Sequence, residues 1–283
     1  MTRRFTRLAW IAATFTYLLI LLGAVVRISG SGLGCGEHWP LCNGRLLPPL
    51  DLPTLIEYGH RLAALAVSVL VVALAGYAWW LRRVPAGANG PLAAPSDATL
   101  GRPSAAPYVA LALLVLQVAL GAVTVRLSLP PWTVILHLGT AMLLLAALLL
   151  AARGSRRAAR SGAALGAVAL GFATVLLGAL TANLGAGSAC LGFPLCNGQL
   201  LPAGDYLQRL QETHRLFAYT LCGYAVWWAV RTGRREALGV VALLALQLAV
   251  AAAMVLLALP APLQAAHVAV GAAVWAGLVL AVV

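Results

Sequence analysis

The sequence has few charged residues, and acidic ones are the scarcest. Among 283 residues only 7 are Asp or Glu, none is Lys, and 9% are charged, whereas soluble domains carry about 25%. Hydrophobic residues make up 62% of the chain. This composition excludes a disordered chain, a collagen and a small secreted fold held by disulfides. The net charge of +12 does not indicate a nucleic-acid partner in so apolar a chain, and the composition predicts a multi-pass membrane protein.

Eight stretches approach the length of about 20 apolar residues that spans a bilayer. They are residues 8–26, 62–81, 108–125, 132–152, 163–182, 216–230, 237–259 and 263–283. We therefore expect an all-α integral membrane fold with eight transmembrane helices. Arginines precede the first stretch, as in a signal peptide, but no small-residue cleavage site follows it, so we expect this helix to be retained.

Arginines are distributed unequally between the two sets of predicted loops. One set, which includes both termini, holds 13 arginines and the other holds 6. Because basic residues concentrate in cytoplasmic loops, we expect both termini to be cytoplasmic. Residues 85–107, rich in Pro, Gly and Ala, are expected to form a flexible cytoplasmic linker.

The chain contains an internal repeat. Residues 40–48 recur as residues 194–202 with a single difference, Arg45 against Gln199. Further matches fall at the same relative places: His60-Arg61 with His214-Arg215, Gln117 with Gln247, and His137 with His267. We predict two halves, residues 1–152 and 153–283, each a four-helix bundle, related by a pseudo-symmetry axis along the membrane normal.

Four of the five histidines lie in this repeat, each near the outer end of an even-numbered predicted helix. A single histidine there is explained by an interhelical hydrogen bond, but two at matched depth in each half favour haem, because neutral imidazole is the usual axial ligand of haem iron. The predicted pairs are His60 with His137 and His214 with His267. Zinc fits less well, since no thiol or carboxylate lies at matching depth in both halves. His38, in a loop, has no counterpart and is expected to be solvated.

Two cysteine pairs lie in matching outer loops. Cys35 and Cys42 belong to the first loop, and Cys190 and Cys196 to its repeat. The outer face is oxidising, so each pair can close a disulfide. The disulfides would either staple a loop that covers the haem pocket or exchange with thiols, and both roles stay open. Cys222, in mid-helix, is expected to be a core thiol.

A carboxylate accompanies the histidine pair in the first half only. Glu57 precedes His60 by three residues and shares its helix face, whereas the matching position holds Gln211. Glu212 of the second half lies off the face of His214. Glu57 could exchange a proton with a substrate or simply favour the helix N-terminus.

Four outer arginines are candidates for contacts with haem propionates. Arg27 and Arg126 occur in the first half only, and Arg61 and Arg215 occur in both. The alternative is that they extend to the membrane interface, as Arg commonly does. Together with Glu57, this asymmetry predicts a reactive haem site in the first half and a fixed haem in the second.

At this point the motifs resemble a known family, bacterial haem A synthase, over nearly the whole chain. The resemblance is carried by Gly30-Ser31-Gly32-Leu33, the Cys-containing loop of residues 39–44, Glu57-x-x-His60-Arg61 and the paired histidines. It implies oxidation of a methyl group of haem O to a formyl group through hydroxylated intermediates. Haem O would be held by His60 and His137, and a permanent haem b by His214 and His267. Glu57 matches the acidic residue of the family's substrate site.

The resemblance also implies a place and partners for the protein. It implies the bacterial inner membrane, a role in cytochrome oxidase assembly, and the two cysteine pairs of the family's loops. The oxidation removes four electrons, so an electron acceptor is required, and a haem O synthase is a plausible partner. The alternatives are a di-haem b-type electron carrier, a haem transporter or chaperone, and, more remotely, a thiol oxidoreductase. The four histidines of the repeat all lie at one depth, near the outer side. This disfavours the electron carrier, because a path for electrons across the membrane would need haems in both leaflets.

Overall fold

The residues that the structure describes form eight long α-helices and one short 3₁₀ helix. The computed structural model describes residues 2–83, 104–154, 162–200 and 204–282. Within these residues the helices are α1 (Arg3–Ile28), α2 (Leu52–Arg83), α3 (Ala106–Arg126), α4 (Pro131–Arg153), α5 (Gly162–Asn183), η1 (Ala186–Ser188), α6 (Tyr206–Thr232), α7 (Arg235–Leu256) and α8 (Ala261–Ala281). The prediction of an all-α fold is confirmed.

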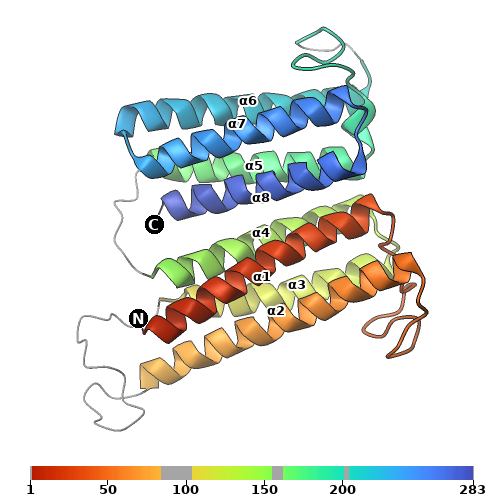
Figure 1. The fold of residues 1–283 in the computed structure, drawn as a ribbon, viewed down its shortest axis with the longest axis vertical. Helices are drawn as coiled ribbons and strands as arrows, with labels where there is room; N and C mark the ends of the chain where they lie inside the picture. Colours follow the sequence, from red (N-terminus) through yellow and green to blue (C-terminus); the bar gives the residue numbers. More distant parts are fainter. Residues whose placement is uncertain (1, 84–103, 155–161, 201–203, 283) are drawn as a thin grey trace.

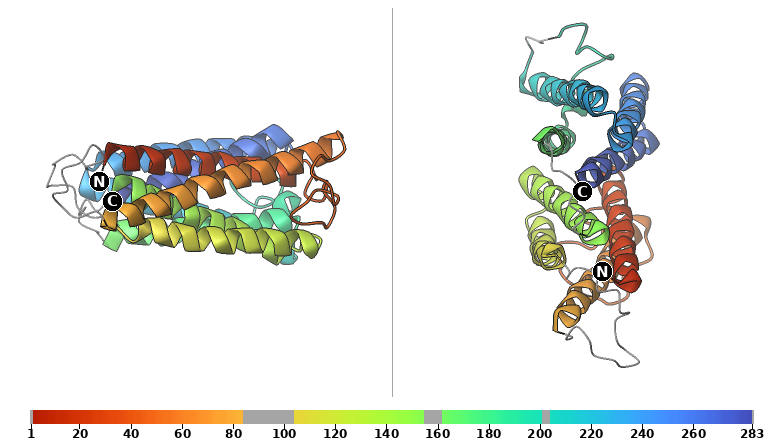
Figure 2. Two further views of the ribbon diagram at one scale, coloured as in Figure 1. Left: turned by 90° about the horizontal axis from the view of Figure 1, so that it is seen from below. Right: turned by 90° about the vertical axis from the view of Figure 1, so that its left-hand side faces the viewer.

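The helices lie side by side in two groups, α1–α4 and α5–α8 (Figure 1). Both termini lie at one end of the helices, and the two cysteine-containing loops lie at the other, which we call the outer end (Figure 2). The groups meet where α4 packs against α5 and where α8 packs against α1 and α4. The grouping agrees with the predicted halves, while the symmetry axis between them stays a prediction.

Seven of these helices, all except α6, are long and apolar enough to cross a membrane, so the chain is a multi-pass membrane protein. The 27-residue α6 is long enough, but it falls short in hydropathy. Polar residues fill its first turns, and Tyr and Trp side chains follow among its apolar residues. It nevertheless lies along α5 and α7 (Figure 1), which favours the predicted eighth span.

Several predicted boundaries were wrong by a few residues. The linker was predicted to reach residue 107, but α3 already begins at Ala106, because Pro107 suits the first turn of a helix. Residues 85–103 of that linker lie outside the described residues. The stretch 237–259 runs past the end of α7 at Leu256, since Ala258 and Leu259 have positive φ. The helix α2 begins ten residues before the predicted span and therefore carries Glu57 and His60.

Two hydrogen bonds join the halves in the interior. The Tyr17 hydroxyl of α1 donates to the Ala269 carbonyl of α8 at 2.9 Å, and the Trp275 indole of α8 donates to the Met142 carbonyl of α4 at 2.8 Å. The Trp275 ring also packs against Phe172 of α5, with 5.4 Å between ring centroids. Because these contacts tie α8 to α1, α4 and α5, the two histidine pairs are held on one connected scaffold.

Candidate functional site

The structure brings the first predicted histidine pair together near the outer end of α1–α4. His60 is the ninth residue of α2 and His137 the seventh of α4, and the two rings lie near each other. The Nδ1 atoms of both rings are buried and have no hydrogen-bond partner. The Nε2 atom of His137 lies 3.0 Å from the Gln117 amide nitrogen of α3.

The second pair occupies the equivalent places in α5–α8. His214 is the ninth residue of α6 and His267 the seventh of α8, and these two rings also lie near each other. The Nδ1 atom of His214 is buried without a partner. The Gln247 amide nitrogen lies 3.1 Å and 3.2 Å from the two ring nitrogens of His267. Neither glutamine was predicted as a site residue, although both were visible as members of the repeat.

Glycines on neighbouring helices allow three of the rings to lie against helix backbone. A Cβ atom on Gly23 or Gly121 would come within 3.3 Å or 3.2 Å of the Cε1 atom of His60 or His137, respectively. On Gly178 it would come within 2.8 Å of the His214 Cε1 atom. These three rings can therefore lie where they do because the glycines facing them have no side chain.

The residues present fit haem. Each half offers two imidazoles on different helices, and among the described residues three of the four rings have a buried nitrogen without a hydrogen-bond partner, which suits an iron ligand. Among the described residues, the single group of three potential metal ligands is Cys190, Cys196 and Glu212, which includes none of the four histidines.

Both predicted disulfides are present, Cys35–Cys42 and Cys190–Cys196. All four cysteines are at most 1% exposed. Thiol exchange requires an attacking thiolate to reach a sulfur atom, so this burial favours the staple over the exchange role. Cys222 is a half-buried free thiol.

Glu57 is anchored to the first cysteine loop. Its side chain is buried, its Oε2 atom accepts the Cys35 N–H at 2.7 Å, and its Oε1 atom accepts from Arg61. In the second half the Gln211 Oε1 atom accepts the Cys190 N–H, also at 2.7 Å. Glu57 is not in the first turn of α2, which weakens the helix-dipole explanation. The two residues share one loop contact and differ in charge.

Two of the four candidate arginines are occupied by the loops. The Arg61 guanidinium donates to the carbonyls of His38 and Leu41 at 2.8 Å and 3.0 Å. The Arg215 guanidinium donates to carbonyls of the second loop, those of Cys190, Gly192 and Pro194. By contrast, Arg27 and Arg126 form no hydrogen bond or ion pair with any residue that the structure describes. The arginines found in one half only are thus the two that are free to bind a ligand.

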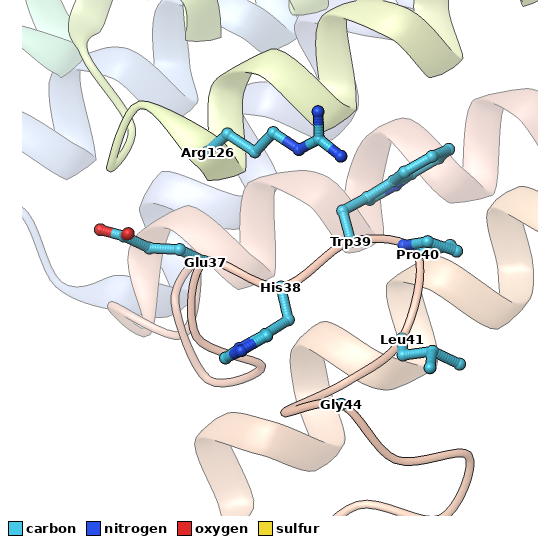
Figure 3. Close-up of a pocket in the computed structure, with 7 residues that line it drawn as sticks. All are labelled: Glu37, His38, Trp39, Pro40, Leu41, Gly44 and Arg126. Carbon is cyan, nitrogen blue, oxygen red and sulfur yellow. The ribbon is translucent and has the colours of Figure 1, made fainter.

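A pocket of about 310 Å³ lies between the first loop and the end of α3. It is lined by residues 37–41, Gly44 and Arg126. Figure 3 shows the Arg126 guanidinium extending toward the Trp39 ring, while the Glu37 carboxylate points to the other side. His38 is exposed, in agreement with the prediction that it is solvated.

Glu212 has an environment that the sequence did not predict. The side chain is 2% exposed, and neither carboxylate oxygen has a hydrogen-bond partner. It lies close to the sulfur atoms of Cys190 and Cys196. Glu212 therefore lies against the second cysteine loop, and it does not occupy the position that Glu57 has in the first half.

Comparisons with known proteins agree with this arrangement. The family model COX15-CtaA, described as cytochrome oxidase assembly protein, matches residues 6–279. A heme A synthase of Symbiobacterium thermophilum is 33% identical over 257 residues, which cover 82% of this chain and 79% of the relative. A heme A synthase of Bacillus licheniformis is 29% identical over 245 residues, 80% and 74% of the two chains.

A shorter match has a different name. A protoheme IX farnesyltransferase of Thermus thermophilus is 44% identical over 80 residues, which are 28% of this chain but 13% of that protein. The family model, in contrast, extends over nearly the whole chain, from the first helix to the last. The chain belongs to the COX15-CtaA family of cytochrome oxidase assembly proteins.

Proposed function

We propose that this chain is a haem A synthase, which oxidises a methyl group of haem O to a formyl group through hydroxylated intermediates. The observation that carries the proposal is the pair of imidazoles in each half, with Glu57 one helical turn before His60 where the second half has Gln211. The full-length similarity to heme A synthases supports the same activity. A di-haem electron carrier would have no need of this chemical difference between its two sites.

The two halves take different roles in this proposal. Residues 1–152 bind haem O as the substrate, with His60 and His137 as iron ligands. Residues 153–283 hold haem b through His214 and His267, and this haem, when bound, supplies one-electron redox chemistry. Gln117 and Gln247 orient the His137 and His267 rings through the contacts described above. An acceptor outside the chain must take the four electrons removed.

Glu57 is the proposed catalytic carboxylate. Its Oε1 atom is held by Arg61 and its Oε2 atom by the Cys35 N–H, so its position one helical turn before His60 is fixed. From there it accepts a proton as the hydroxylated methyl group is converted to the aldehyde. Gln211 shows that an amide can make the same loop contact. The charge of Glu57, rather than its shape, is therefore the feature specific to the first half.

We place the protein in the bacterial inner membrane with both termini in the cytoplasm, because the loops at that end hold most of the arginines. We also propose that a haem O synthase supplies the substrate. The similarity to a protein named for farnesyl transfer to protohaem IX supports a link to such an enzyme.

The test is the haem content of protein purified from a host that makes haem O, identified by chromatography and mass. We expect haem b together with haem A or its hydroxylated precursor. Haem b alone, with added haem O unmodified under oxidising and reducing conditions, would instead support an electron carrier. In His137→Ala the haem O-derived product should disappear while haem b remains, and in the matched His267→Ala variant haem b should be lost.

The role of Glu57 is tested by Glu57→Gln. Because Gln211 accepts the equivalent N–H, this variant keeps the loop contact and removes only the charge. We expect conversion of haem O to fall by about 100-fold or more, within the range of general acid–base contributions, with haem b retained. The matched variant Gln211→Glu should retain conversion. Full turnover by Glu57→Gln would contradict the catalytic role proposed for Glu57.

A further inference from the structure

The pocket under the first outer loop combines a free cation with an aromatic ring. Arg126 is exposed and has no partner among the described residues, and the Trp39 ring lies beside it (Figure 3). The nearest acidic residue in the pocket, Glu37, accepts a hydrogen bond of 2.6 Å from the Ser128 hydroxyl and points away from Arg126. The guanidinium is thus available to an anion from outside the chain.

The second half lacks this combination. The cavity at the matching place is about 110 Å³ and is lined by Gly187, Ser188, Cys190, Leu191, Val255, Ala258 and Leu259, none of them charged. The residue that corresponds to Arg126 is Leu256, and Phe193 corresponds to Trp39. The second half therefore offers no charged group to an anionic ligand at this place.

The pocket lies on the outer side of the first histidine pair. Arg126 follows Gly121 by five residues on α3, about 7.5 Å further along the helix axis. Gly121 itself faces the His137 ring, with 3.2 Å between an added Cβ and the Cε1 atom. Arg126 therefore lies nearer the outer end of α3 than the level of the His137 ring.

We propose that this pocket is the carboxylate-recognition site for the porphyrin substrate, in which the Arg126 guanidinium binds a propionate and the Trp39 ring packs against the macrocycle. The inference rests on the proposed function, since it takes the substrate to be a haem. Arg pairs with carboxylates through strong charge-assisted hydrogen bonds, and an aromatic ring provides the apolar contact. Arg61 does not fill this role, because its donors already bind Glu57 and loop carbonyls.

The experiment compares two charge-removing variants with two ligands. Arg126→Leu introduces the residue that the second half has at the matching position. The control, Arg45→Gln, likewise introduces the second-half residue, at an arginine of the first cysteine loop that does not line the pocket. The ligands are haem with free propionates and its dimethyl ester. Binding to detergent-solubilised full-length protein is followed by the change in Soret absorbance.

We expect Arg126→Leu to weaken binding of the free-acid haem by about 10- to 100-fold and to leave binding of the diester unchanged. Arg45→Gln should leave both unchanged. Equal binding of the free acid by Arg126→Leu and wild type would overturn the proposal, and so would an equal loss of both ligands. The spectrum of the second-half haem reports folding of each variant. Conversion of haem O by the wild type tests the proposed function independently, so the two failures are distinguishable.

Discussion

Substituting Gly178 by Ala should weaken haem binding in the second half. Gly178 of α5 faces His214 of α6, and an added Cβ would lie 2.8 Å from Cε1, 3.3 Å from Nε2 and 3.4 Å from Nδ1 of the ring. Ordinary contact begins at 3.4 Å, so the Cε1 atom must retreat by 0.6 Å to reach it, the difference between 3.4 Å and 2.8 Å. The added methyl group would collide with the edge of the His214 ring that lies nearest α5.

The helix that carries His214 cannot easily provide this movement. Arg215, the next residue, is hydrogen-bonded to carbonyls of the second loop, and the Asp205 side chain caps the start of α6 by accepting the Gln208 N–H at 3.0 Å. The ring must therefore rotate away from its rotamer, at a cost of about 0.5–1.5 kcal/mol. A misplaced ligand lowers metal affinity by about 10- to 100-fold, as found for residues that orient metal ligands, and we expect the same here for haem b.

The assay is the haem b content and absorbance spectrum of the purified variant, with haem titrated into protein that lacks it. Gly223→Ala is the control, since Gly223 lies in α6, the helix that carries His214, and nothing lies within 4 Å of a Cβ added there. Gly23→Ala should have a smaller effect on the first site, because its Cβ would stay 3.3 Å from His60. Full haem b content and an unchanged spectrum in Gly178→Ala would refute the packing of the His214 ring against α5.

Three further outcomes are expected. Replacing Cys190 and Cys196 by Ser should lower stability by about 2 kcal/mol, measured by thermal unfolding in detergent, with haem b retained if the disulfide is only a staple. Trp275→Phe should cost about 0.5–1.5 kcal/mol in the same measurement, because it removes the hydrogen bond from the indole to the Met142 carbonyl. Hydrogen bonds from Thr54 lower the pKa of Asp51 below its ordinary value of 3.8. The capping contact at the start of α2 is therefore complete above that value and lost as the pH falls through the lowered pKa. The protection factor of the amides there, taken relative to intrinsic exchange at each pH, should fall in acid, and it should not change with pH in Asp51→Asn.

Much of the architecture could be predicted from the sequence, because a membrane helix is a local feature. Seven of the predicted spans meet length and hydropathy requirements in the structure. The exception, α6, carries Arg209, Glu212 and Arg215 in its first turns. A hydropathy window counts such residues as unfavourable, whereas the structure uses Arg215 to hold a loop. The predicted span therefore started late, as it did for α2.

The candidate site was predicted only as far as the repeat made it visible. The histidines and cysteines recur at fixed offsets, so their grouping followed from the sequence. The glycines behind the rings did not, because the significance of Gly178 depends on which helix faces His214. Likewise, the sequence offered four arginines as equivalent candidates. Their division into loop-binding and free residues depends on the path of the two loops, which no periodicity encodes.

The natural difference between Glu57 and Gln211 separates scaffold from chemistry in this fold. Both side chains accept the N–H of the first cysteine in their loop at 2.7 Å, and Arg61 and Arg215 both bind loop carbonyls. Contacts made in both halves cannot explain why one half would transform its haem and the other retain it. The explanation must come from groups found in one half only, and the described residues supply a fixed carboxylate at Glu57 and a free cation at Arg126. A variant that carries Glu at position 211 and Arg at position 256 would show how far those two groups suffice.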